Sequence, residues 1–231
     1  MISGYNIPDI KKKQIIKFWR SQMKQILCFG DSNTYGYIPE TKGRYEFEER
    51  WSGILSKKLE KEGYRIIEEG LVGRTTVFDD ELRIGRRGAD LLPVLLESHN
   101  PVEHVILMLG TNDCKTVYGA SAEVIGKGIE KLLCQIESAD RKIKVLLISP
   151  IWLGDKVWED GYDPEFNEQS VETSKRLKSV YEKIAKKHQC DFLAASDYVS
   201  PSEADREHLS KESHKVLADV IYRKFVDALA G

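Results

Sequence analysis

The chain has 231 residues, of which 41% are hydrophobic and 31% are charged, so it can bury one sizeable core and is too balanced in charge to be disordered. Lys and Arg number 35 and Asp and Glu number 37, which gives a formal charge of -2 and disfavours nucleic acid as a partner, because nucleic-acid binders usually carry a basic excess. No stretch approaches the ~18 uninterrupted apolar residues that a membrane helix needs. The sequence therefore predicts one globular domain that does not span a membrane.

The amino-terminal segment and the cysteines indicate the compartment. A secretory signal needs a continuous apolar stretch, but lysines at positions 11–13 and Arg20 interrupt the apolar residues here. The four cysteines are far apart, and none forms a C-x-x-C pair. We therefore expect free thiols and a cytoplasmic location.

Short apolar runs alternate with longer segments of helical period, which is the pattern of a βαβ chain with a mostly parallel sheet. The predicted elements, in chain order, are a strand at 26–29, a helix at 51–62, a strand at 64–67, a helix at 90–98, a strand at 104–109, a helix at 121–138, a strand at 144–148, a helix at 168–188, a strand at 191–193 and a helix at 212–229. The later helices carry apolar residues mostly three, four or seven positions apart, as core-facing stripes do. No internal repeat or linker indicates a second domain.

Polar residues and glycines follow three of these strands, where the reactive loops of an open parallel sheet lie. Gly30-Asp31-Ser32 follows the first strand, and in isolation Asp31 and Ser32 are equally typical of a tight turn or a helix cap. Gly73 lies in the loop after the second strand, where a glycine lets the backbone N–H approach a ligand. Asn112 follows the third strand and offers a side-chain amide, unless it forms an Asx turn.

A carboxylate and an imidazole follow near the end of the chain. Asp205 precedes His208 by three residues, a spacing that lets the carboxylate orient one ring nitrogen and leaves the other free as a base. With Ser32 as nucleophile and the neutral donors of the earlier loops, these groups complete the set that acyl transfer requires. Cys114 is a rival nucleophile, but no histidine is near it in sequence. The remaining four histidines have no acidic residue at an orienting spacing.

Four blocks of the sequence resemble the SGNH subgroup of the GDSL esterases, a family named for a serine, a glycine, an asparagine and a histidine. The blocks are Gly30-Asp31-Ser32, Gly70-Leu71-Val72-Gly73-Arg74, Gly110-Thr111-Asn112-Asp113 and Asp205-Arg206-Glu207-His208. The resemblance covers about residues 25–229 and is closest to the arylesterase and acyltransferase branch, which a mycobacterial enzyme typifies. It implies a three-layer α/β/α sandwich with a five-stranded parallel sheet of flavodoxin-like topology.

The resemblance also implies roles for individual residues. Ser32 would be the nucleophile, His208 the general base and then acid, and Asp205 the carboxylate that orients His208. The oxyanion hole would consist of the backbone N–H groups of Ser32 and Gly73 and the side-chain amide of Asn112. No metal or organic cofactor is implied.

The implied function is a serine esterase that hydrolyses short-chain acyl esters, acetyl or aryl, through an acyl-serine intermediate, with acyl transfer as a further activity. A carbohydrate O-acetylesterase and a non-catalytic relative that binds acylated sugar remain alternatives. A nucleotide-binding module is disfavoured because the sequence has no phosphate-loop motif, and an α/β-hydrolase is disfavoured because it has no G-x-S-x-G.

Residues around these blocks are candidates for binding the ester substrate. Asp31, Tyr35 and Arg74 adjoin the blocks, and Tyr35 occupies a region where the branch commonly has other bulky residues. The segment 151–162 is long and aromatic, so Trp152 and Trp158 either form a pocket rim or anchor a surface loop in the core.

The first 22 residues lie outside the resemblance, and the hydrolase domain is expected to span residues 23–231. We expect the extension to be dispensable for hydrolysis. Relatives form oligomers, so a homo-oligomer is an open expectation.

Overall fold

The computed structural model describes residues 23–230, with side chains described up to residue 227. The elements in chain order are β1 (Lys24–Gly30), α2 (Ser32–Tyr35), α3 (Trp51–Leu59), η1 (Glu60–Glu62), β2 (Tyr64–Gly70), α4 (Gly88–Ser98), β3 (His104–Met108), η2 (Asn112–Cys114), α5 (Ala122–Ala139), β4 (Lys144–Ser149), α6 (Glu168–His188), β5 (Asp191–Ala194), η3 (Ala195–Asp197) and α7 (Lys211–Ala230). The predicted alternation of strands and helices is confirmed. The predicted extension, residues 1–22, lies outside the described residues.

The five strands form one parallel sheet in the order β2-β1-β3-β4-β5. The chain runs from β1 to one side and then returns to add β3 on the other side of β1. Gly30 at the end of β1 pairs with Met108 at the end of β3, so the loops after these two strands diverge from one point. Ligands of open α/β sheets bind at such a switch point.

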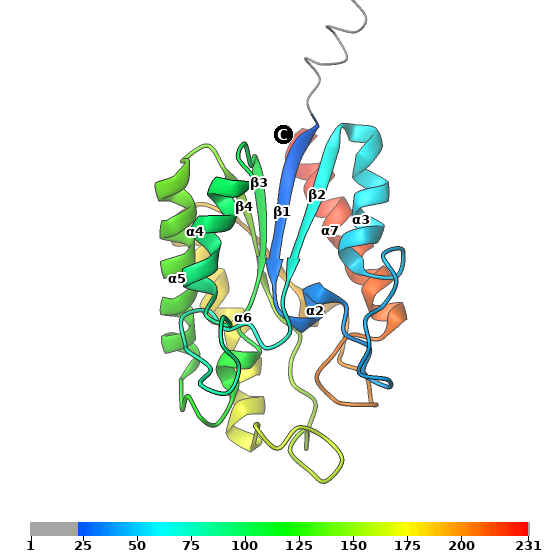
Figure 1. Ribbon diagram of the computed structural model, residues 1–231, viewed down its shortest axis with the longest axis vertical. Coiled ribbons are helices and arrows are strands. Elements are labelled where there is room, and N and C mark those ends of the chain that lie inside the picture. The colour runs from blue at the N-terminus through cyan, green and yellow to red at the C-terminus, as the bar shows by residue number, and fades with distance from the viewer. Residues whose placement is uncertain (1–22, 231) are drawn as a thin grey trace, which may run out of the picture.

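Helices cover both faces of the sheet and form the predicted three-layer sandwich (Figure 1). Side chains of β1 alternate between the two cores, since successive residues of a strand point to opposite faces. Leu27 and Phe29 pack in the core that includes α4, α5 and α6. Ile26 and Cys28 pack in the core that includes α3 and α7.

Two differences from the sequence prediction concern the segments that follow β1 and precede β2. Ser32 begins a helix of four residues, α2, that is too short for any periodicity to reveal. The helix predicted at 51–62 ends as an α-helix at Leu59 and continues as a 3-10 turn, which Gly63 closes with a left-handed φ of 80°.

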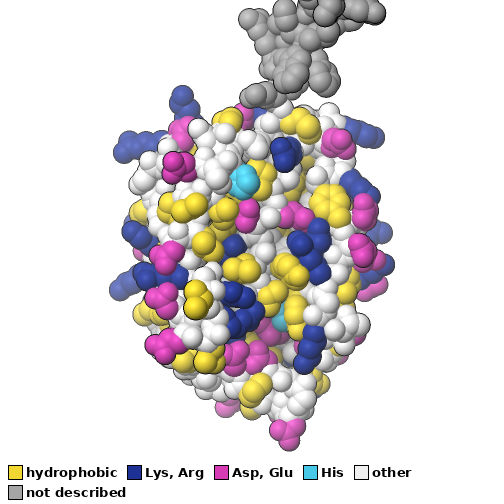
Figure 2. All heavy atoms as spheres, in the orientation of Figure 1, with side chains coloured by type: hydrophobic (Ala, Val, Ile, Leu, Met, Phe, Trp, Pro, Cys, Tyr) yellow, Lys and Arg dark blue, Asp and Glu magenta, His cyan; other side chains and the backbone are white. Residues whose placement is uncertain are grey.

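The surface is mixed in charge. Figure 2 shows acidic and basic side chains intermingled over this face, as the near-zero net charge leads one to expect. Among the described residues, no helix combines the length and the apolar composition that crossing a bilayer requires.

Candidate active site

The loops after β1 and β5 bring Ser32, Asp205 and His208 together. His208 Nε2 lies 2.8 Å from Ser32 Oγ, and His208 Nδ1 lies 2.6 Å from Asp205 Oδ2. Ser32 and His208 are both buried. A hydroxyl, an imidazole and a carboxylate are therefore hydrogen-bonded in series, although 176 positions separate the serine from the histidine.

Local hydrogen bonds fix the serine at the end of β1. Asp31 caps α2 by accepting the N–H of Asn33 at 3.0 Å. Gly36 ends the helix with a left-handed φ of 83°, and a side chain there would collide with Arg50. This tight turn leaves the Ser32 hydroxyl directed at His208.

Asn33 joins the serine turn to the histidine loop. Its Oδ1 accepts the N–H of Leu209 at 2.9 Å, and its Nδ2 donates to the Glu207 carbonyl at 3.5 Å. Within the loop, Asp205 Oδ1 accepts the N–H of Glu207 at 3.0 Å and that of His208 at 2.9 Å. No role was predicted for Asn33 from the sequence, and only its position next to Ser32 signals one.

Carboxylates govern the electrostatics of His208. Burial alone would lower the pKa of His208, but Glu207, the hydrogen bond to Asp205 and the charge of Asp31 outweigh it and raise this pKa to about 8. Burial would raise the pKa of Asp205, but the hydrogen bond from His208 outweighs it and lowers that pKa below its usual value. Asp205 is therefore ionised at neutral pH and stabilises a protonated imidazole.

The three predicted oxyanion donors lie on the same cleft as the serine. Gly73 has a left-handed φ of 82°, and a Cβ there would lie 2.6 Å from the guanidinium of Arg83, so the position requires glycine. Asn112 opens η2, and its Nδ2 donates to the Arg74 carbonyl at 3.1 Å. Ser32, Gly73 and Asn112 all line the cleft that also contains Asp205 and His208.

The cleft is small and mostly polar. Its volume is ≈ 260 Å³, and it is bounded by the loops that follow β1, β2, β3, β4 and β5. Besides the residues already described, its polar and aromatic lining comprises Tyr37, Lys42, Arg83, Lys115, Tyr162, Asp163, Glu165 and Glu207. The Tyr37 ring packs against the His208 ring, with 4.3 Å between centroids. Lys115 forms an ion pair with Glu165 at 2.5 Å.

None of the five residues predicted to bind substrate lines this cleft. Asp31 is buried behind Ser32 as a cap, and Arg74 is buried with its guanidinium on the Gly30 carbonyl at 2.9 Å. Arg44 covers the Tyr35 ring at 4.3 Å. Trp158 packs on the core and Trp152 is exposed, so the alternative of an anchored loop describes Trp158.

Sequence reasoning gave no individual role to the polar and aromatic lining residues Tyr37, Lys42, Arg83, Lys115, Tyr162, Asp163, Glu165 and Glu207. Glu207 carried a usable signal, because it lies inside the Asp205-to-His208 block next to the histidine. The others become neighbours only when separate loops meet.

Cys114, the rival nucleophile, lies outside the cleft lining. It is buried, and its thiol donates to the Gly110 carbonyl at 3.4 Å. Burial raises the pKa of the Cys114 thiol well above its usual value, so no thiolate is available for attack.

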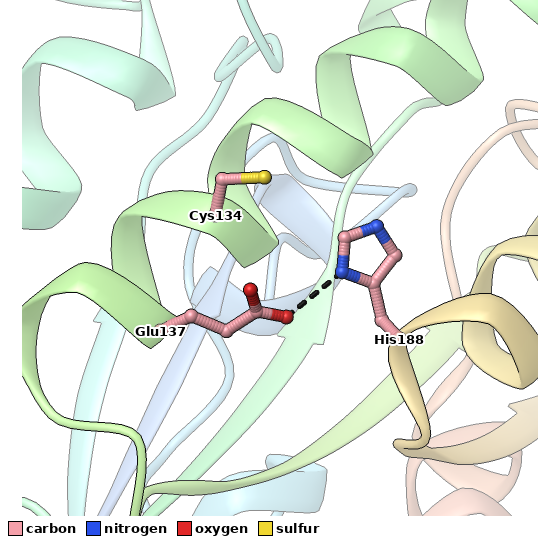
Figure 3. Close-up of side chains that lie close together, drawn as sticks. All are labelled: Cys134, Glu137 and His188. Atoms are coloured by element: carbon pink, nitrogen blue, oxygen red, sulfur yellow. Dashed lines mark hydrogen bonds and ion pairs between the residues drawn. The ribbon is translucent and has the colours of Figure 1, made fainter.

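One group of described residues has the composition of a metal site, but it lies away from the cleft. Cys134 and Glu137 on α5 and His188 at the end of α6 offer ligand atoms within 4.8 Å of one another (Figure 3). His188 Nδ1 already lies 2.8 Å from Glu137. None of the three lines the cleft, so this group takes no part in ester chemistry there.

The sequence matches the GDSL-like lipase/acylhydrolase family over residues 28–216. The chain belongs to this family. It is accordingly a carboxylic ester hydrolase with the SGNH fold. No match was found among curated proteins.

Solved structures of family members superpose over almost the whole described chain. Est24, a carbohydrate acetylesterase from Sinorhizobium meliloti, is 37% identical, with a TM-score of 0.82 over 89% of this chain and 99% of its own. A carbohydrate acetylesterase family member from the same organism is 32% identical, with a TM-score of 0.80 over 87% and 96% of the two chains. The native aryl esterase of M. smegmatis is 30% identical, with a TM-score of 0.80 over 88% and 99%.

Proposed function

We propose that this esterase hydrolyses short-chain acyl esters, acetyl esters foremost, through an acyl-Ser32 intermediate. The observation that carries the proposal is the hydrogen-bonded series from Asp205 through His208 to Ser32 inside a cleft of ≈ 260 Å³. A cleft of this size has room for a short acyl chain beside the alcohol part of the ester.

The chemistry proceeds in two steps. His208 Nε2 takes the proton of Ser32 Oγ as this oxygen attacks the carbonyl carbon of the ester. The N–H groups of Ser32 and Gly73 and the amide of Asn112 stabilise the oxyanion. The intermediate collapses, its bond to the alcohol oxygen breaks, and His208 returns the proton to the leaving alcohol. Water, or an alcohol in acyl transfer, then attacks the acyl-serine by the same route and frees Ser32.

A second candidate is a carbohydrate O-acetylesterase, and the lining of the cleft favours it. Lys42, Arg83, Lys115, Asp163 and Glu165 offer hydrogen-bond partners to a polyol, whereas an aryl group would use mainly the faces of tyrosine rings. Both substrate classes appear among the relatives named above.

The test is a panel of p-nitrophenyl acetate, butyrate and octanoate with acetylated xylan and acetylated amino sugars. We expect kcat/KM to fall from acetate to octanoate, and S32A to lose at least about 10⁴-fold of it. S149A is the matched control, because Ser149 is a buried serine at the end of β4 whose hydroxyl has no partner among the described residues. S149A should keep its activity.

Two results would contradict the proposal. Retention of activity in S32A would remove Ser32 from the reaction, and a preference for octanoate would exclude the short-chain assignment. A higher kcat/KM on acetylated carbohydrate than on p-nitrophenyl acetate would select the second candidate.

A further inference from the structure

Glu207 places a second carboxylate against the histidine of the site. Its side chain is 8% exposed, and its Oε1 lies 3.7 Å from His208 Nε2, the nitrogen that faces Ser32. Within residues 23–230, His208 is the one ion-pair partner of the Glu207 carboxylate. Glu207 also lines the cleft, so it borders the space where an ester would bind.

The two carboxylates of the loop reach opposite nitrogens of one ring. Arg206, between Asp205 and Glu207, has a left-handed φ of 59°, which turns the chain between them. Asp205 lies on Nδ1 and Glu207 lies near Nε2. A protonated ring has an N–H on both nitrogens and is stabilised by both anions. A neutral ring, in the form that accepts the serine proton, presents a lone pair toward Glu207 and gains from Asp205 alone.

Charged groups from other elements modify this pair. Asp31, at the end of β1, adds to the charge that stabilises a protonated His208. Burial raises the pKa of Glu207 to about 7 against the opposing charge of His208; Asp163, in the loop before α6, raises it further, and Lys115, after η2, lowers it. Glu207 and His208 therefore titrate as a coupled pair, and an activity profile reports the pair.

The aromatic neighbours of His208 bring no charge at neutral pH. The Tyr37 ring lies tilted against the imidazole, and burial raises the pKa of its hydroxyl further above neutrality. Burial lowers the pKa of nearby His214 to about 3, so this ring is neutral. Among the groups that act on His208, both Glu207 and Asp205 favour its protonated form, Glu207 through its charge and Asp205 through a hydrogen bond and its charge.

We propose that Glu207 is a positioning residue that holds His208 protonated across neutral pH, so that the enzyme acquires its general base only under alkaline conditions. The inference rests on the proposed function, because it takes His208 as the base. It predicts that removing the Glu207 charge makes the enzyme more active at neutral pH, whereas the loss of a purely structural side chain would lower activity at every pH.

The kinetic test compares pH profiles of kcat/KM on p-nitrophenyl acetate for wild type, E207Q and E203Q. E203Q is the matched control, since it removes an exposed carboxylate from the same loop. A nearby opposite charge shifts a pKa by about 1 unit or more. E207Q should therefore lower the apparent pKa on the acid side of the kcat/KM profile by ~1 pH unit and raise kcat/KM at pH 7 about fivefold. The gain should vanish by pH ~9, where His208 is neutral in both proteins. An unshifted apparent pKa in E207Q, or an equal shift in E203Q, would overturn the proposal.

An NMR titration of the imidazole resonances in the full chain separates this proposal from the proposed function, because it reads His208 whether or not the protein turns over. H208N identifies the resonance by its absence. A lower His208 pKa in E207Q than in wild type is the expected result, and equal values would refute the role of Glu207 even if S32A is inactive. Activity retained in S32A would refute the proposed function alone. If E207Q does not fold, E207D moves the carboxylate and should give an intermediate shift, with no shift counting against the proposal.

Discussion

The loop before α7 and the first turn of α7 each bury a histidine, and the two rings have opposite electrostatics. His208 lies between the carboxylates of Asp205 and Glu207, and its pKa rises to about 8. His214 is fully buried, accepts the N–H of Trp51 at 3.3 Å, and has a pKa that burial lowers to about 3. Their positions differ by only six residues, and in the sequence only the Asp205 three residues before His208 sets the two apart.

The difference shows what turns a buried histidine into a base. Burial disfavours the charged form of both rings, and in His214 nothing offsets it. At His208 the carboxylates reverse the effect, so the ring can hold the proton that it takes from Ser32 before it passes this proton on. His214 serves as a hydrogen-bond acceptor for α3 instead.

Replacing each histidine with asparagine should give the largest difference in activity between the two positions. H208N removes the base and should lower kcat/KM on p-nitrophenyl acetate by at least about 10⁴-fold. H214N keeps an acceptor for the Trp51 N–H and should remain within severalfold of wild type. Circular dichroism checks that both variants fold. Equal losses in the two variants would contradict the separation of roles.

Replacing Asp205 tests the role of the carboxylate that orients His208. D205N removes the anion that fixes the His208 tautomer and should lower kcat by about 10³-fold or more. This is opposite in sign to the gain expected for E207Q at pH 7, although both changes neutralise a carboxylate on the same ring. Stopped assays across pH 6 to 9 measure the two effects together, and a gain in D205N would refute its orienting role.

Replacing Asn112 tests how the protein stabilises the negative charge that develops on the substrate oxygen, rather than the charge on the histidine. N112A removes one oxyanion donor and should lower kcat by about 10²-fold, with a smaller change in KM. Steady-state kinetics on the acetyl ester give both values. A change confined to KM would mean that Asn112 binds the ground state and is no oxyanion donor.

The smallest effect concerns stability at acid pH. The unfolded chain protonates His214 near pH 6.5 and the folded protein near 3, so the unfolded state binds more protons between these values. The free energy of unfolding should therefore fall as the pH drops below 6.5, by up to about 1.4 kcal/mol per unit for this group. Urea unfolding at pH 7, 5.5 and 4.5 should show a shallower fall in H214N than in wild type. Burial also lowers the pKa of His104, to about 4, so part of the slope should remain. Identical slopes would exclude His214 as a source.

Most of the fold could be predicted from the sequence because the core residues recur at the spacings typical of strands and helices. The apolar runs of the strands and the stripes of the helices matched the observed elements, and the helix at 168–188 matched residue for residue. The four loop blocks also led to the cleft, since the carboxyl ends of parallel strands meet at one edge. The serine turn α2 escaped prediction because four residues hold less than two helical periods.

The sequence could not predict which loop side chains face the substrate, because the direction in which such a side chain points depends on the conformation of its loop. Arg74 and Asp31 adjoin the motif blocks, yet their side chains turn inward to bond the backbone. Glu207, inside a block, turns into the cleft. Lys115 meets Glu165 across 50 residues of chain, a contact that no spacing rule contains.

The central claim, acyl transfer through Ser32, is tested most directly by trapping the intermediate. Wild type is mixed with p-nitrophenyl acetate, quenched in acid within the first turnover, digested and analysed by mass spectrometry. We expect one acetyl group on the peptide that contains Ser32 and none on that peptide in S32A. Acetylation of Cys114, or turnover in an enzyme whose Ser32 is never acylated, would contradict it.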